Sequence, residues 1–471
     1  MKGYLGKFWV ALPVLFAFVL SLASCSGDDY VDTIPENSIA VVSIDMKKTM
    51  GQTGVDENKA ATLVNELLKV DDASECGIDF TSKIYVFESA EGNIGLVAKV
   101  SDDGKLDKWF NELSKNGYCQ QTLERSDSRF TVIKDSWVAG FSSDALLVMG
   151  PVMVAQQAEA KQQIAKYLKQ EEEQSIKGTP MFDKLDSLSS PIAVVAQAAA
   201  LPSKFVAPFT LGAPKEADPS QIIIAAEMNA DNGSLVIKGE TFSLNKSIDN
   251  ALKESVKVFR PITDKYLKTM PDNAAFGMFM NVDGKDFIGL LHSNKSLQAL
   301  LTGLNTAIDM DNIIKSIDGD LSVVMHQFGD DNAAMQMSAQ LGSKSFLDDV
   351  DYWKQSCPSG SKITDWAKDA YCFTNGSMSY YFGVTSDLQY YSGSTEELAL
   401  LSAGKLDGNS DAQANAYKPL LTGVEDKIKG QRMCMVLNIG SILDKEGSDS
   451  AVSGLLKPLL GNINTVIYTI K

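Results

Sequence analysis

Thr33-Ile34-Pro35-Glu36-Asn37-Ser38 opens the first apolar strand of this 471-residue chain. The same pattern returns 236 positions later as Thr269-Met270-Pro271-Asp272-Asn273-Ala274. Each copy leads into an apolar run, over residues 39–45 in the first case and 275–283 in the second. Self-similarity at a fixed offset is the sequence mark of a repeated architecture. The two openers therefore predict two units that begin in the same way.

Four further matches keep the same order along the chain and nearly the same offset. They are Ile78-Asp79 with Ile317-Asp318 at offset 239, 140–144 with 383–387 at 243, 192–197 with 433–438 at 241, and Ile222 with Ile463 at 241. Ordered matches with a slowly drifting offset indicate a tandem duplication. We expect a first repeat over residues 33–244, a connector over 245–268 and a second repeat over 269–471.

Hairpin and meander patterns outnumber strand–helix–strand patterns within each copy. They predict an α+β fold, with an antiparallel or mixed sheet in each repeat covered by helices on one face. A long Gln- and Glu-rich helix is expected over 152–176, with part of it projecting into solvent. The connector carries apolar residues at helical spacing from Ile248 to Ile262, and Pro261 is expected to kink that helix.

The N-terminus resembles a bacterial lipoprotein signal. Lys2 and Lys7 precede an apolar run over 8–23, which is short for a membrane span and typical of a signal-peptide core. The run ends in Leu22-Ala23-Ser24-Cys25, which resembles the lipobox. That resemblance implies cleavage of residues 1–24 and acylation of Cys25, with palmitate-like chains that anchor the protein without a transmembrane helix.

The residues after Cys25 indicate the compartment. Ser26 resembles the sorting residue of lipoproteins sent to the outer membrane, and residues 25–32 form an acidic tether. The acidic residues at 28 and 29 resemble the surface-export signal of Bacteroidetes lipoproteins, but a periplasmic protein would carry an equally acidic tether. We therefore expect an outer-membrane, lipid-anchored protein on either the periplasmic face or the cell surface.

Composition excludes several classes of partner and cofactor. The 60 acidic residues exceed the 43 basic ones, for a net charge of -17, which argues against nucleic acid. The chain has only two histidines, His292 and His326, and no sequence motif for a metal or an organic cofactor. We expect no cofactor and no metal.

Five cysteines remain besides Cys25, at positions 76, 119, 357, 372 and 434. An odd number excludes complete internal pairing. Cys357 and Cys372 are the closest two in sequence and are the candidates for a disulfide. The alternative is that they are small buried thiols in a core that needs no cross-link.

No nucleophile motif supports a catalytic assignment, so the sequence favours a non-enzymatic role. Aromatic residues are concentrated between Phe346 and Tyr391, and two adjacent pairs, Tyr380-Tyr381 and Tyr390-Tyr391, must point to opposite faces of their strands. One ring of each pair could share an exposed face for a sugar or a protein partner. The alternative is an aromatic core with hydroxyls at its rim.

The lipobox, the acidic tether and the repeated strand opener together resemble an uncharacterised family of Bacteroidetes outer-membrane lipoproteins. The resemblance implies no established activity. The sequence thus predicts a lipid-anchored envelope protein that binds or scaffolds a glycan or protein partner. The alternative is an envelope hydrolase, because carboxylate pairs of the kind that cleave glycosidic bonds cannot be detected among 60 acidic residues.

Overall fold

A computed structural model describes most of the chain beyond its N-terminal segment. The residues it describes are 29–470, apart from 54–61, 63, 67, 126, 202–205, 207–208, 232, 295–297, 299–307, 327–333, 377, 405–417 and 442–462. The chain forms two compact units. The first comprises residues 1–206, 219–237 and 448–463, and the second comprises 207–218, 238–447 and 464–471.

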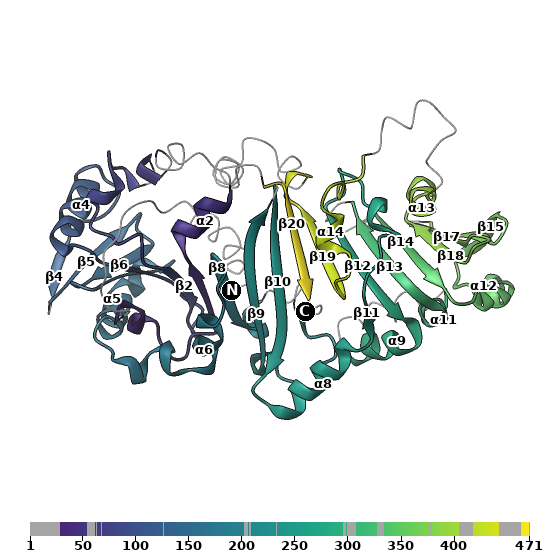
Figure 1. Cartoon of the computed structure of the whole chain (residues 1–471), viewed down its shortest axis with the longest axis horizontal. Coiled ribbons are helices and arrows are strands. Elements are labelled where there is room, and N and C mark those ends of the chain that lie inside the picture. Colours follow the sequence, from purple (N-terminus) through teal and green to yellow (C-terminus); the bar gives the residue numbers. More distant parts are fainter. Residues whose placement is uncertain are drawn as a thin grey trace. The chain divides into compact units, whose positions relative to one another are not determined.

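The first unit is built on one antiparallel sheet (Figure 1). Its strands are β1 (Ala40–Ile44), β2 (Ile84–Glu88), β3 (Ile94–Lys99), β4 (Leu123–Arg125), β5 (Ser128–Ile133), β6 (Trp137–Phe141), β7 (Ala145–Gly150), β8 (Ile192–Gln197) and β9 (Ile222–Asp231). The strand order is β9-β8-β1-β2-β3-β7-β6-β5-β4, and every one of these pairings is antiparallel.

Helical elements cover both faces of this sheet. They are η2 (Asp29–Thr33), α2 (Met46–Thr53), η3 (Ala73–Glu75), α4 (Asp103–Lys115), η4 (Val154–Gln156), α5 (Gln157–Tyr167), η5 (Glu172–Gln174), η6 (Ile176–Gly178), α6 (Pro180–Asp186), η7 (Ala198–Ala200) and η8 (Pro219–Gln221). On one face, Leu106 and Phe110 of α4 pack with Val86 and Phe141. On the other, Tyr85 of β2 contacts Tyr30 of η2 at a ring distance of 6.0 Å. The expectation of helices on one face only is wrong.

The second unit also contains an antiparallel sheet. Its strands are β10 (Ser234–Ser243, which begins in the first unit), β11 (Phe259–Arg260), β12 (Phe276–Asp283), β13 (Ile317–Met325), β14 (Met335–Leu341), β15 (Lys362–Ala367), β16 (Ala370–Thr374), β17 (Ser379–Val384), β18 (Gln389–Gly393), β19 (Met433–Asn438) and β20 (Thr465–Ile470). The order from β20 is β20-β19-β12-β13-β14-β18-β17-β16-β15.

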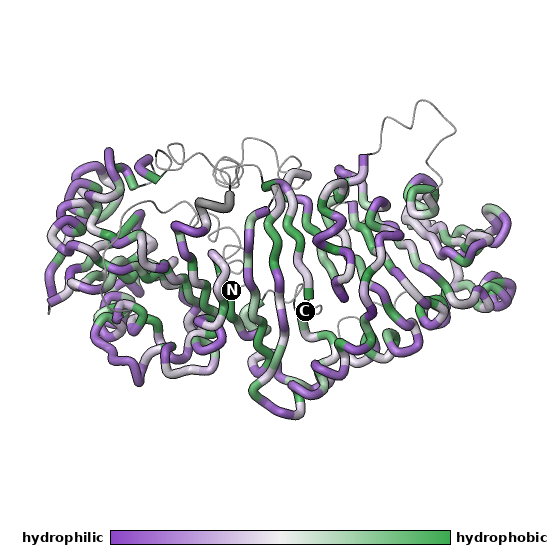
Figure 2. Tube along the Cα trace, in the orientation of Figure 1, coloured by the Kyte–Doolittle hydropathy of each residue, from purple (hydrophilic) through white to green (hydrophobic). Residues whose placement is uncertain are grey.

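Helices again lie on both faces of the sheet. They are α8 (Lys246–Val256), η9 (Leu267–Thr269), α9 (Gly284–Ser293), α11 (Met310–Lys315), η10 (Ser345–Asp349), α12 (Val350–Ser356), α13 (Glu396–Ser402) and α14 (Glu425–Ile428). Phe287 of α9 and Trp353 of α12 belong to the larger core, and Ile428 of α14 belongs to a separate cluster with Val436. In Figure 2, hydrophobic residues recur along the strands of each unit.

The strand opener makes the same local contacts in both units. Pro35 forms an isolated antiparallel bridge with Ser175, and Pro271 forms one with Pro419. The hydroxyl of Thr33 donates to the carbonyl of Tyr30, and that of Thr269 donates to the carbonyl of Tyr266, both at 2.7 Å. The two units therefore share their strand order and the geometry of their first turn.

The helix expected over 152–176 is shorter than predicted, because η4 leads into α5 and α5 ends at Tyr167. The segment after it bonds to the opener, because the amide of Gln170 donates to the carbonyls of Asp32 and Ile34. Ser175 and Ile176 are fully buried. Tertiary contacts with η2 thus replace helical hydrogen bonds over these residues.

The connector is helical only in its first half. α8 ends at Val256, and Phe259 and Arg260 form β11 against Val282 and Asn281 of β12. Pro261 disfavours helical backbone only at Arg260, which already lies in β11, so it follows the end of the helix and does not kink it. The whole connector belongs to the second unit.

The fold starts within the segment expected to be a tether. Tyr30 and Val31 of η2 are 3% and 1% exposed, so the folded first unit includes residues only a few positions after Cys25. Cys25 itself lies outside the described residues. Over the part of the chain that the structure describes, no helix is both long enough and apolar enough to cross a bilayer.

Candidate functional site

The first tyrosine of the aromatic candidates, Tyr380, lies on the core face of β17 with Tyr390 of β18. The two hydroxyls are 2.8 Å apart, and the hydroxyl of Tyr380 also donates to Oγ of Ser392 at 3.0 Å. Tyr390 is completely buried, and burial raises its pKa well above the ordinary value, with Tyr380 adding to the shift. This face is interior to the second unit.

The partners Tyr381 and Tyr391 point to the opposite face, where α13 covers the sheet. Tyr391 is 3% exposed and packs with Ala370 and Ala399. Tyr381 is half-buried and its ring lies 5.1 Å from that of Trp366. Since helices cover both faces, the four tyrosines form no exposed platform, and the aromatic-core alternative describes them.

The edge of this aromatic cluster has a polar contact that the sequence did not indicate. The indole N–H of Trp366 donates to Oε1 of Glu396 at 3.2 Å. Trp366 is half-buried, whereas Glu396 at the start of α13 is exposed. The contact fastens β15 to α13 and is structural.

Cys357 and Cys372, the candidate disulfide pair, are not bonded to each other. Both are free thiols, as are Cys76, Cys119 and Cys434. Burial raises the pKa of Cys372, and it raises the pKa of Cys76 to about 11. Thiols with a raised pKa carry little thiolate at neutral pH and are poor nucleophiles. Cys76 and Cys434 are therefore small buried core residues, and none of the five cysteines forms a cross-link.

A polar recess of about 500 Å³ opens in the second unit and is the candidate binding site. It lies at the C-terminal end of β12, the start of β13 and the loop that follows β14. Its lining includes three carboxylates, two ammonium groups, an amide and three hydroxyls, above the buried ring of Phe346. They belong to Asp283, Asp318, Asp349, Lys285, Lys315, Asn312, Ser316, Ser343 and Ser345.

Secondary structure holds these side chains in place. Asp283 and Asp318 are directly opposite each other on β12 and β13. The Asp283 carboxylate caps α9 by accepting the Lys285 backbone N–H at 2.9 Å, and Asp318 pairs with Arg260 at 2.8 Å. The N–H of Gly342 donates to the carbonyl of Ser316 at 2.9 Å, which ties the loop to the end of α11. The recess therefore offers two carboxylates held by a helix cap and an ion pair, beside ammonium and hydroxyl groups.

At the matching place in the first unit, the start of α4 packs against a glycine and fills the space. Ile78 bridges Val100 as Ile317 pairs with Leu341, so Gly77 corresponds to Ser316. A Cβ on Gly77 would lie 2.3 Å from the carbonyl oxygen of Asp102 and 2.5 Å from the backbone nitrogen of Leu106. The first turn of α4 thus packs directly on Gly77. A side chain cannot occupy that space, and the second unit has a serine and a recess there.

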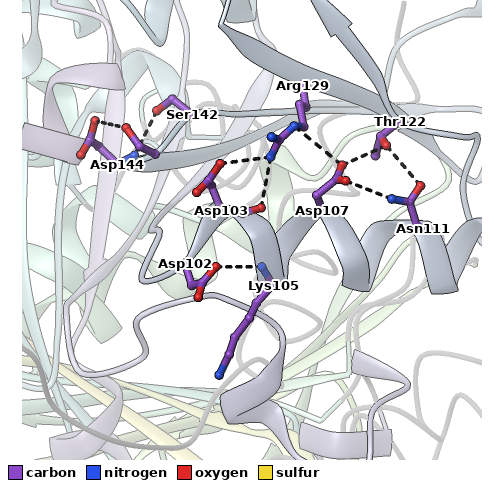
Figure 3. Close-up of polar contacts among 10 residues, drawn as sticks. Asp102, Asp103, Lys105, Asp107, Asn111, Thr122, Arg129, Ser142 and Asp144 are labelled. Atoms are coloured by element: carbon purple, nitrogen blue, oxygen red, sulfur yellow. Dashed lines mark hydrogen bonds and ion pairs between the residues drawn. The ribbon is translucent and has the colours of Figure 1, made fainter.

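Figure 3 shows how the first unit uses its polar groups around α4. Asp102 caps the helix by accepting the Lys105 N–H at 2.9 Å. Arg129 of β5 donates to Asp103 at 3.1 Å and lies 4.0 Å from Asp107. Thr122 completes the network by donating to Asp107 at 3.0 Å. Asp103 and Asp107 fasten α4 to β5 through Arg129, and Asp102 caps the helix, so these carboxylates have structural roles.

Sequence reasoning missed the recess. Asp318 was recognised only as a marker of the repeat, and the change from Gly77-Ile78-Asp79 to Ser316-Ile317-Asp318 was the signal that could have found the site. Within the described residues, no group of three or more His, Cys, Asp or Glu side chains is arranged to hold a metal ion.

These features define an α+β protein of two units, each with an antiparallel sheet between helices and one with a polar recess. The chain belongs to a family described as a domain of unknown function, DUF4836, whose model matches residues 30–444. No curated protein matches it.

Two solved structures of TP0453 show weak similarity. Crystal form IV is 8% identical over 45% of this chain and 79% of that chain, with a TM-score of 0.29. Crystal form III is 7% identical over 81% and 99%, with a TM-score of 0.23.

Proposed function

We propose that this protein is a lipid-anchored envelope protein that binds a polar ligand without transforming it, and that the recess of the second unit is its binding site. The observation that carries the binding role is the recess of about 500 Å³ lined by charged and hydroxyl groups. Its volume falls within the range of about 300–1,000 Å³ typical of small-ligand sites. Acylation of Cys25 would place it at the outer membrane.

The chemistry of the lining favours a glycan over a protein partner. Sugar hydroxyls both donate and accept hydrogen bonds, and the recess offers carboxylate acceptors beside ammonium and hydroxyl donors. A protein partner would need an interface of roughly 800 Å² on this chain, which a recess of this size does not supply. Of the two partners that the sequence suggested, the recess supports the glycan.

An envelope hydrolase is the second candidate, and one observation favours it. Asp283 and Asp318 are cross-strand neighbours, and such pairs have Cβ atoms about 4.5–5.5 Å apart. Carboxylates of glycosidases are separated by about 5–10 Å. Against catalysis, Asp283 caps α9 and Asp318 is paired with Arg260. Release of reducing sugar that Asp283→Asn abolishes would favour the hydrolase.

Filling the recess tests the binding role. Ser345→Trp places a large ring among the polar groups of the recess and should weaken binding to the best ligand on a bacterial and host glycan array by about ten-fold or more. Ser345 is exposed, so the variant should remain folded. Gln355→Trp, on the exposed side of α12 outside the recess, is the control. Equal binding by both variants would reject the recess as the site.

Anchoring is tested separately at Cys25. Cys25→Ala should abolish incorporation of alkyne-labelled palmitate and release the protein from the membrane fraction, because two acyl chains supply stable anchoring. Cys357→Ala, which removes a thiol from the folded part of the chain, should stay in the membrane fraction. Membrane retention of Cys25→Ala would contradict the lipobox assignment.

We also propose that the two units arose by duplication of one α+β unit. Their strand orders match from β9-β8-β1 to β5-β4 and from β20-β19-β12 to β16-β15. The bridges of Pro35 and Pro271 support the same descent. Ile223 of β9 lies opposite Gln197, and Thr465 of β20 lies opposite Asn438. Ile223 therefore corresponds to Thr465, so β9 and β20 are related by an offset of 242 rather than the expected 241.

A further inference from the structure

A second pocket in the second unit differs in chemistry from the polar recess. It has a volume of about 290 Å³ and lies between α8, the end of β10 and the residues at 209–211. Its walls are mainly apolar, with Phe209, Leu211, Phe242, Leu252, Val256 and Phe259 among them. Phe209 also packs edge-on against Tyr468 of β20 at 5.2 Å. The pocket is therefore a preformed apolar space at the surface of the unit.

A rigid cation stands at the rim of this apolar space. Arg432 is exposed and lines the pocket, and its Nη1 donates to the carbonyls of Val256 at 3.3 Å and Phe259 at 2.8 Å. These bonds fix the plane of the guanidinium and use two of its five N–H donors. Two further charged groups line the pocket. Lys253 is ion-paired with Asp249 at 2.7 Å, and Glu240 is the single carboxylate.

We infer that this pocket binds a single-chain amphiphile with a carboxylate head, such as a medium-chain fatty acid. Its chain would fill the apolar space, and its head would lie on Arg432. Guanidinium groups match carboxylates in geometry and charge. Because Asp249 already pairs with Lys253, an anionic head is favoured by Arg432, whose Nη1 alone is bonded to the backbone and whose other N–H donors can receive a carboxylate. This ligand differs from that proposed for the recess, and the inference does not depend on lipid anchoring.

The volume of the pocket limits the length of the ligand's alkyl chain. At about 30 Å³ for each group of water size, 290 Å³ holds roughly ten groups. Decanoate therefore fits, whereas a diacyl phospholipid does not. Each buried methylene should tighten binding about four-fold, so affinity should rise from hexanoate to decanoate and then level off.

Calorimetric titration of the protein carrying Cys25→Ala tests this inference. We expect decanoate to bind more tightly than 1-decanol or decylamine, and phosphatidylglycerol vesicles to leave decanoate binding unchanged. Arg432→Gln should weaken decanoate about ten-fold or more and bring it to the level of 1-decanol. Tighter binding of decylamine, displacement by the vesicles, or an unchanged affinity in Arg432→Gln would overturn the inference.

A second pocket variant, compared with a control outside the pocket, separates loss of binding from loss of folding. Val256→Trp fills the pocket from α8 and should abolish decanoate binding. Leu244→Trp changes a residue that is 61% exposed on the segment before α8 and does not line the pocket, so it should bind normally. Circular dichroism melts of both variants establish that they are folded. Decanoate binding by a folded Val256→Trp variant would place the ligand elsewhere and reject the pocket.

Discussion

Gly77→Ala is expected to destabilise the first unit by about 2–5 kcal/mol. Two costs add. A φ of +80° is unfavourable for a residue with a side chain by about 1–2 kcal/mol. The new Cβ would also lie 2.3 Å from the carbonyl oxygen of Asp102 and 2.5 Å from the nitrogen of Leu106, both backbone atoms that cannot move without displacing α4. Overpacking of that kind typically costs about 1–3 kcal/mol.

Gly92→Ala is the matched control for Gly77→Ala. Gly92 has the same φ of +80°, but nothing lies within 4 Å of its added Cβ. It should therefore lose only the conformational term, about 1–2 kcal/mol. Native-state hydrogen exchange of the α4 amides measures both variants, because it reports the stability of one unit without assuming that the whole chain unfolds together. Equal losses in the two variants would show that α4 does not pack on Gly77.

The second large effect is expected for Tyr390→Ala, at about 3–5 kcal/mol. Its ring is completely buried beside Phe346, 6.4 Å away, and deleting a large buried aromatic leaves a cavity. The hydroxyl of Tyr380 would keep Ser392 as a partner at 3.0 Å, so little further cost arises from an unsatisfied polar group. Tyr390→Phe, which removes only the hydroxyl, should lose about 1 kcal/mol.

Tyr352→Ala is the control for the aromatic truncation. Tyr352 on α12 is 69% exposed, so its truncation should change the free energy of unfolding by less than about 0.5 kcal/mol. Urea unfolding, monitored through hydrogen exchange of the β17 and β18 amides, gives the free energy of unfolding of all three variants. A Tyr390→Ala variant as stable as Tyr352→Ala would mean that the face of Tyr390 is exposed, and it would restore the aromatic binding face.

Much of the fold could be predicted from local pattern. The strands β1 and β12 lie within about two residues of the apolar runs expected over 39–45 and 275–283. Ile78 and Ile317, which the sequence matched only as repeat positions, pair with Val100 and Leu341 in the structure. The helix expected over 152–176 stops at Tyr167. The residues after it bond to the opener, more than 130 residues away in sequence, where the side-chain amide of Gln170 donates to the carbonyls of Asp32 and Ile34. Helical spacing contains no information on such distant contacts.

The candidate sites were less predictable than the fold. The sequence located the aromatic cluster and showed that neighbouring tyrosines face opposite sides, but it could not show that α13 covers one side and α12 packs into the core on the other. The polar recess depends on where Asp283 meets Asp318 across two strands. Register between strands is set by packing and turn geometry, which single positions do not reveal.

By itself the sequence determined the α+β class and the paired openers, because turn residues and hydrophobic periodicity act over a few neighbouring positions. The tertiary structure decided which polar groups converge and which rings are buried. Gly77 and Ser316 show the reason. The two residues stand at matching positions in the two units. In the first unit α4 packs against Gly77 and fills the space there, whereas in the second unit Ser316 lines an open recess. Whether a cavity forms depends on how distant segments pack, and that is a property of the folded chain.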